Sequence, residues 1–189
     1  VCGILMPEVN PVMTVKLPAS VVCAVLLLSL PALAQQSANP LTTTQMNVFS
    51  AVKSYLIRSA EKMPEANYNF RPVPEVRTFG QILAHVADAQ FEGCLGILGQ
   101  ANPSPNVEKT KTSKAAVTQA LKDSFTYCEK AFAGLTDANA AASVSYYGSQ
   151  YPKLSALSGI SMHNVEHYGN LVTYLRIKGL VPPSSEPRP

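Results

Sequence analysis

The sequence is poor in charge and has no cluster of basic residues. Charged residues make up only 14% of the 189, and 15 Lys and Arg against 12 Asp and Glu leave a formal net charge of +3. Because the basic residues are scattered along the chain, the electrostatic footprint of a nucleic-acid-binding protein is missing, and we expect no nucleic-acid partner. The composition also excludes collagen-like, coiled-coil and low-complexity chains. With 47% hydrophobic residues, the chain fits a globular protein large enough for one domain with a sizeable core.

The sequence also lacks an apolar run long enough to span a membrane. Residues 21–30 form an apolar run that has about half of the ~20 residues a transmembrane helix needs. Lys16 precedes this run, and an Ala-x-Ala pattern ending at Ala34 follows it, as in a secretory signal peptide. We therefore expect residues 1–34 to be an N-terminal extension and signal peptide, cleaved after Ala34. The mature protein is expected in the periplasm or outside the cell, with no stable membrane span.

Cysteines are few, and only two of the four lie beyond the predicted signal peptide. In an oxidising compartment Cys94 and Cys128 can form a disulfide, but two thiols can equally be buried apart as small apolar side chains. The spacing of the two residues does not decide between these alternatives. Cys94 follows His85 by nine residues, which places it on the opposite side of a helix and outside any site on the His85 face.

Four segments place apolar residues at helical spacing and carry the end signals of helices. N-cap candidates for the first lie at residues 42–44. The second opens with Thr78 and Gln81 in the arrangement of a capping box, and Ser113 is the predicted N-cap of the third. Pro152 lies near the first position of the fourth. The predicted helices cover about residues 41–63, 78–99, 113–134 and 152–177.

The segments between these helices predict irregular connections. Three prolines forbid a regular helix in residues 64–77, which we expect to form a long ordered connection or a short extended arm. Residues 100–112 are polar and predict a loop. Residues 144–147 have some strand character, but a lone short strand would have nothing to pair with. Residues 136–151 are therefore predicted to be an irregular crossover.

Four helices of similar length and no credible sheet predict an all-α fold, an antiparallel four-helix bundle. The predicted bundle spans residues 41–181. A linker at residues 35–40 precedes it, and a Pro-rich tail at residues 182–189 follows it.

The three histidines all fall on predicted helices. His163 and His167 are four residues apart, so their imidazoles lie ~40° apart around the helix axis and ~6 Å apart along it. That is close enough to hold one ion, with a third ligand supplied by another helix. Neutral imidazoles suit divalent first-row ions, and three protein ligands leave a coordination position open for water or substrate. The alternatives are a polar surface stripe for the pair and a hydrogen-bonded core or rim histidine for His85.

Three segments of the sequence resemble the DinB-like (damage-inducible) family of four-helix bundles. They are residues 63–80, residues 82–89, and residues 163–176, followed by Gly179 and two prolines. The resemblance covers nearly the whole mature chain. It implies an up-down-down-up bundle with a long crossover, pairing into a homodimer, and a bound divalent cation such as Zn, Ni, Fe or Mn. The metal ligands that it implies are His85, His163 and His167.

Characterised members of this family are metal-dependent transferases or isomerases that use a low-molecular-weight thiol. Such thiols are concentrated in the cytosol, whereas the predicted signal peptide directs this chain out of it. The chain therefore departs from the family in the compartment where its reaction would take place.

Polar side chains on the faces of the histidines are candidates to orient a ligand or a water molecule. Glu166, three residues after His163, is the candidate catalytic carboxylate, as a general base or a hydrogen-bond partner. The other candidates are Asp88 and Glu92 near His85, and Asn170 and Tyr174 beyond His167. Asp88 and Glu92 can also be explained as ordinary solvated helix surface.

These observations predict an exported divalent-metal-binding protein, a metal-dependent transferase or hydrolase acting on an unidentified small molecule. The rival hypothesis is a non-catalytic metal-binding module, which needs the same ligands but no general base and no substrate cavity. A third hypothesis is a structural bundle whose histidines bind no ion.

Overall fold

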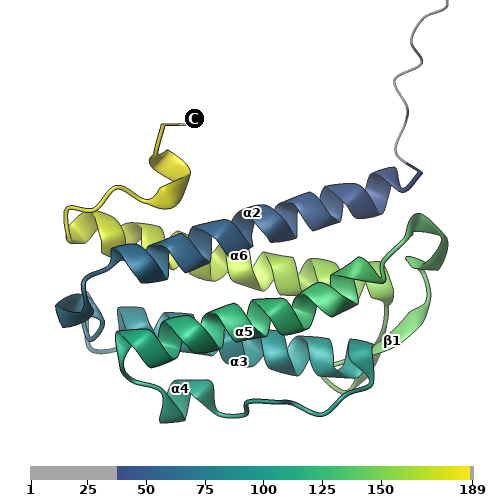
Figure 1. Cartoon of the computed structure of the whole chain (residues 1–189), viewed down its shortest axis with the longest axis horizontal. Coiled ribbons are helices and arrows are strands. Elements are labelled where there is room, and N and C mark those ends of the chain that lie inside the picture. The colour runs from purple at the N-terminus through teal and green to yellow at the C-terminus, as the bar shows by residue number, and fades with distance from the viewer. Residues whose placement is uncertain (1–37, 188–189) are drawn as a thin grey trace, which may run out of the picture. The chain divides into compact units, whose positions relative to one another are not determined.

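The computed structural model describes residues 38–187 (Figure 1). The predicted signal peptide and the first half of the predicted linker lie outside the described residues. Within that range, no helix has the length and apolarity that crossing a bilayer requires. Four long helices make up most of the described chain, as predicted. They are α2 (Pro40–Lys62), α3 (Phe79–Leu98), α5 (Lys114–Ala133) and α6 (Lys153–Ile177).

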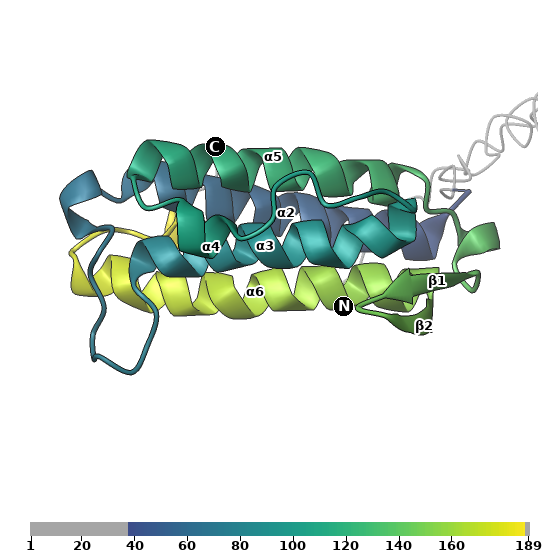
Figure 2. The ribbon, with the colours of Figure 1, turned by 90° about the horizontal axis from the view of Figure 1, so that it is seen from below.

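These helices form an up-down-down-up bundle. In Figure 1, α2 runs in one direction, α3 and α5 run in the opposite direction, and α6 returns parallel to α2. Both α2 and α3 pack against α5 and α6. Because α3 and α5 are parallel neighbours, the chain must travel back along the bundle between them, and residues 99–113 do so (Figure 2). The prediction of an all-α bundle with a long crossover is confirmed.

The crossover contains a one-turn helix, α4 (Val107–Thr110), where the sequence predicted only a loop. The carboxylate of Asp88 on α3 accepts hydrogen bonds from the backbone N–H groups of Val107 (2.7 Å) and Glu108 (2.8 Å). These are amino-end groups that have no partner within a helix. The cap comes from another helix, so no local pattern in residues 100–112 could indicate it.

Two helix starts follow the local sequence signals. Thr78 and Gln81 form the predicted capping box, with Gln81 N–H donating to Thr78 Oγ1 (3.2 Å) and Thr78 N–H donating to Gln81 Oε1 (2.9 Å). Ser113 Oγ accepts the N–H of Ala116 (3.3 Å) at the start of α5. Both caps satisfy N–H groups that the helix leaves unpaired, and both were predicted correctly.

The start of α2 differs from the prediction. The helix begins at Pro40, so the threonines at residues 42–44 lie inside it and none of them is the N-cap. Instead, the carboxylate of Asp137 accepts hydrogen bonds from Leu41 N–H (3.2 Å) and Thr42 N–H (2.9 Å). Although desolvation works in the other direction, these bonds hold the pKa of Asp137 below its usual value. The cap is again supplied from a distant part of the chain.

The segment after α5 is not the irregular crossover that the sequence predicted. It folds into an antiparallel hairpin of β1 (Ser143–Tyr146) and β2 (Ser149–Pro152). Tyr147 and Gly148 form its two-residue turn with φ of 47° and 78°, the positive values that a type I′ turn needs. The prediction failed because it gave the strand at residues 144–147 no partner, whereas the partner follows directly in the sequence.

The hairpin packs against the end of α3 and the start of α6 (Figure 2), where glycines allow a close approach. A Cβ at Gly96 of α3 would lie 2.5 Å from the backbone oxygen of Ser145. A Cβ at Gly93 or Gly159 would lie 3.2 Å and 2.9 Å, respectively, from atoms of the Tyr146 side chain. The two helices thus leave room for the hairpin because these positions carry no side chain.

We expect Gly96→Ala to destabilise the protein by about 1–3 kcal/mol, because a rigid backbone atom must move to make room for the methyl group. Urea unfolding measures this change. Gly169→Ala on α6 is the matched control, since nothing lies within 4 Å of its added Cβ. This control should stabilise the protein by about 0.5–1 kcal/mol through helix propensity. Equal effects of the two substitutions would contradict the close packing of the hairpin.

Three short 3-10 helices complete the described structure: η1 (Glu65–Asn67), η2 (Asp137–Asn139) and η3 (Pro183–Ser185). The first lies in the Pro-containing connection between α2 and α3, which is ordered as predicted. The last belongs to the Pro-rich tail, where Glu186 forms ion pairs with Arg58 and Lys62 of α2.

Aromatic contacts and one disulfide join the helices within the core. Phe49 of α2 stacks on Phe132 of α5, with ring centroids 3.9 Å apart. Cys94 of α3 and Cys128 of α5 are fully buried and joined by a disulfide, with their Cα atoms 5.5 Å apart. Of the two alternatives that the sequence left open, the structure shows the disulfide.

Candidate metal centre

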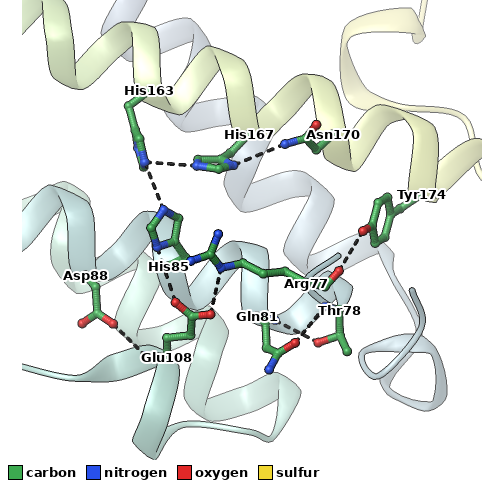
Figure 3. Close-up of polar contacts among 10 residues, drawn as sticks. All are labelled: Arg77, Thr78, Gln81, His85, Asp88, Glu108, His163, His167, Asn170 and Tyr174. Atoms are coloured by element: carbon green, nitrogen blue, oxygen red, sulfur yellow. Dashed lines mark hydrogen bonds and ion pairs between the residues drawn. The ribbon is translucent and has the colours of Figure 1, made fainter. Parts of the chain in front are cut away.

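The bundle brings the three histidines together from two helices (Figure 3). His85 comes from the second turn of α3, and His163 and His167 come from the middle of α6. His163 Nε2 lies 3.2 Å from His85 Nε2 and 3.1 Å from His167 Nε2. One ligand atom from each residue lies within 4.8 Å of the others. The three Nε2 atoms therefore face one another at one point between α3 and α6.

This arrangement fits a first-row metal ion. Three imidazole nitrogens at ~2.1 Å from one ion, at tetrahedral angles, would be about 3.4 Å apart, which is close to the separations observed. Three imidazoles without a carboxylate or thiolate in the set suit Zn, Ni or Fe, and they leave at least one coordination position for another ligand. The donor set thus favours a site that is open to water or substrate.

The surroundings of the histidines favour neutral rings, which is the form that binds a metal. Burial, followed by the nearby His167, lowers the pKa of His163 from 6.5 to about 4. Burial and Arg77 lower the pKa of His85, and burial and His85 lower the pKa of His167. At neutral pH the three rings therefore carry no second proton that an incoming ion would have to displace.

These lowered pKa values predict that the metal-free protein loses stability in acid. In the unfolded chain the His163 side chain binds a proton near pH 6.5, whereas in the folded protein it binds one only near pH 4. Between these values the unfolded state holds more protons, so the free energy of unfolding falls as pH falls from 6.5 to 4. Urea unfolding with a chelator present tests this dependence, and His163→Gln should make it shallower. If the free energy of unfolding of that variant depended on pH as steeply as that of the wild-type protein, the lowered pKa of His163 would be contradicted.

The outward-facing nitrogens of two rings have partners that orient them. His85 Nδ1 lies 3.4 Å from Glu108 Oε2, and Glu108 Oε1 accepts a hydrogen bond from Arg77 Nε (2.8 Å). A carboxylate at Nδ1 keeps the proton there and turns the Nε2 lone pair inward. His167 Nδ1 lies 3.4 Å from the side-chain amide of Asn170, whose oxygen can take the same place after an amide flip.

Sequence reasoning missed Glu108 and Arg77. Glu108 lies in the crossover predicted to be a loop, and the Asp88 cap on α4 and the contact with Arg77 hold it next to His85. Arg77 ends the Pro-containing connection before α3. Neither residue belongs to the helical pattern of the histidines, so no spacing could indicate them.

Replacing Glu108 with glutamine should lower the affinity for a divalent ion by about 10–100-fold, since the partner of a metal-binding histidine sets its orientation and basicity. Competition with a chelator of known affinity measures this change. Glu92→Gln is the matched control, because Glu92 accepts a hydrogen bond from Asn102 instead of contacting a histidine. Equal affinities for the Glu108 variant and the wild-type protein would contradict the orienting role.

Comparison with known proteins identifies the family. The sequence profile of the DinB superfamily matches residues 49–171, which is well over half of the chain. The chain belongs to the DinB superfamily. None of the curated proteins matches this chain significantly.

Solved structures share this DinB fold at low sequence identity. A DinB-like protein from Bacillus cereus is 16% identical with a TM-score of 0.64, over 74% of this chain and 93% of that one. A conserved protein from Enterococcus faecalis is 12% identical with a TM-score of 0.59, over 72% and 95% of the two chains. A DinB-like protein from Bacillus subtilis is 15% identical with a TM-score of 0.55, over 77% and 99%. These likenesses show the fold alone.

The remaining predicted site residues of this DinB protein lie around the histidines without contacting them directly. Glu166 is exposed on α6, and its charge opposes the lowering of the pKa of His163 and His167. Asp88 caps α4, and its charge opposes the lowering of the pKa of His85. Glu92 binds Asn102, and the Tyr174 hydroxyl donates to the backbone oxygen of Arg77 (2.7 Å).

Two hollows adjoin the centre. The first, the polar cleft, measures about 650 Å³, and the second, the apolar groove, about 760 Å³. His167 lines the polar cleft, His163 lines the apolar groove, and Glu166 lines both. The polar cleft also holds Glu75, Arg77, Glu108, Asn170 and Tyr174; the apolar groove holds Val48, Met162 and Val165 with several small or polar residues.

Proposed function

We propose that this DinB protein binds one divalent metal ion through His85, His163 and His167 and uses it to transfer or hydrolyse a group on a small molecule. The observation that carries the proposal is the convergence of the three Nε2 atoms, at 3.1 and 3.2 Å from the central one. Neutral rings and the two adjoining hollows support it.

The chemistry divides between the ion and the chain. His85, His163 and His167 would hold a divalent ion, which would supply Lewis acidity toward a substrate oxygen or a water molecule. Glu108 and Asn170 hold the imidazoles in position, and Arg77 holds Glu108. Glu166, on the wall shared by both hollows, is placed to accept a proton from a water molecule or a substrate hydroxyl.

We propose that the protein works outside the cytosol. The predicted signal peptide supports export, and so does the buried Cys94–Cys128 disulfide, because disulfides persist in oxidising compartments. A cytosolic thiol cofactor would be absent from that setting. Intact mass measurement after cell fractionation tests this proposal, and a chain that begins at Gln35 and leaves the cytosol is the expected result. A cytosolic protein that keeps its first 34 residues would contradict it.

The function is tested by metal analysis followed by a substrate screen. The protein, purified without a histidine tag, should contain about one ion per chain by elemental mass spectrometry. Once a substrate is found, Glu166→Gln should abolish turnover while the ion is retained. Unchanged turnover would show that Glu166 is not the general base. A protein that binds the ion but acts on no substrate class would favour the hypothesis of a non-catalytic metal-binding module.

A further inference from the structure

The apolar groove is an exposed apolar surface beside a candidate metal centre. Three of its side chains are aliphatic or thioether groups open to solvent: Val48 on α2 is 42% exposed, Val165 on α6 is 50% exposed, and Met162 is 72% exposed. Met162 and Val165 are three residues apart and therefore neighbours on one face of α6. Apolar side chains gathered around a hollow, unlike single exposed ones, mark a binding surface.

Polar contacts join the two helices that form the groove, which lie side by side in Figure 1. Gln45 of α2 donates to Ser161 Oγ of α6 (2.7 Å), and Ser158 Oγ donates to Gln45 Oε1 (3.1 Å). These hydrogen bonds set the spacing of α2 and α6 in the groove. The apolar side chains around them therefore line a hollow instead of closing into the core.

The groove is continuous with the candidate metal centre. His163 and Glu166 are part of its wall, and Met162 and Val165 alternate with them along α6. A molecule held at the three Nε2 atoms thus has an apolar surface next to its binding point. The volume of the groove lies within the range of small-molecule sites. A protein partner seated in the groove would instead cover His163.

We propose that the substrate of the three-histidine centre is an amphiphile, a small molecule with a metal-binding polar head and an apolar chain that lies in the groove. This inference rests on the proposed function, because the head requires a metal ion at the histidines. The chain would contact Val48, Met162 and Val165, and the polar cleft would take the part of the head that faces Arg77.

Hydroxamates of different chain length test this proposal on the zinc-loaded protein. Acetohydroxamate and octanohydroxamate carry the same metal-binding head, so isothermal titration compares only their chains. Each methylene group that becomes fully buried is worth about fourfold in affinity. With part of the chain buried, octanohydroxamate should bind about 10–100-fold more tightly than acetohydroxamate.

A substitution in the groove tests whether its side chains cause the tighter binding of octanohydroxamate. Val165→Asn should remove most of the preference for the longer chain and leave acetohydroxamate binding unchanged. Ile177→Asn is the matched control, since Ile177 is 54% exposed on the same helix but outside the groove, and it should keep the preference.

The outcomes separate the two proposals. Equal affinities for the two hydroxamates would overturn the amphiphile and leave the metal centre intact. No binding of either compound, together with no bound zinc, would overturn both. A dimer that Val165→Asn dissociates in light scattering would show that a second copy occupies the groove, and would also overturn the amphiphile.

Discussion

Replacing His163 with alanine should abolish stoichiometric metal binding. His163 Nε2 is the central atom of the three, within 3.2 Å of both others, so its loss leaves His85 and His167 without the ligand that links them. Two imidazoles from different helices hold an ion far more weakly than three. We expect the affinity to fall by more than about a thousandfold, since each lost ligand removes several kcal/mol of coordination energy.

Two measurements check this result. Elemental mass spectrometry should find about one ion per wild-type chain and almost none in the variant. Zinc at about a hundred times its dissociation constant should stabilise the wild-type protein by about 2.7 kcal/mol and leave the variant unchanged. Glu166→Gln is the control, because Glu166 faces the hollows without belonging to the ligand set. A His163 variant that still holds one ion per chain would refute the three-histidine centre.

Removing the disulfide should cause a large loss of stability. The bond joins Cys94 and Cys128 across a separation of 34 residues. Closing a loop of this size lowers the conformational entropy of the unfolded chain, which raises its free energy by about 3–4 kcal/mol. Both residues are fully buried, so a replacement should be small and apolar. Alanine at both positions should therefore lower the free energy of unfolding by about that amount.

Urea unfolding with and without a reductant measures this effect. The reductant should destabilise the wild-type protein and leave the double alanine variant unchanged, which serves as the control for any general effect of the reagent. If the wild-type protein were equally stable under both conditions, the disulfide would contribute nothing to the fold.

Local patterns in the sequence determined the four long helices and the relative position of two of the three candidate metal ligands. The Thr78–Gln81 capping box and the Ser113 cap are interactions within one turn, so residue types at short spacing are enough to predict them. The same holds for His163 and His167, because the pitch of one helix places them on one face.

Contacts between distant segments required the tertiary structure. The Asp137 cap on α2 joins residues 95 positions apart, and Glu108 is held beside His85 by Asp88, which anchors α4, and by Arg77. The hairpin is a local contact that was missed because the strand at residues 144–147 was given no partner, whereas its placement against Gly93 and Gly96 of α3 is a contact between distant segments.

The sequence by itself determined the helical class, the helix ends with local caps, and the histidine pair on one turn of α6, because each depends on interactions between residues a few positions apart. The family resemblance implied that His85 joins this pair, but no local pattern did. The tertiary structure decided that His85 faces the pair, that Cys94 meets Cys128, and that Glu108 and Arg77 complete the surroundings of the centre. These contacts depend on the orientation of α3 about its own axis relative to α5 and α6. That orientation follows from the packing of the whole core, so no short stretch of the sequence determines it.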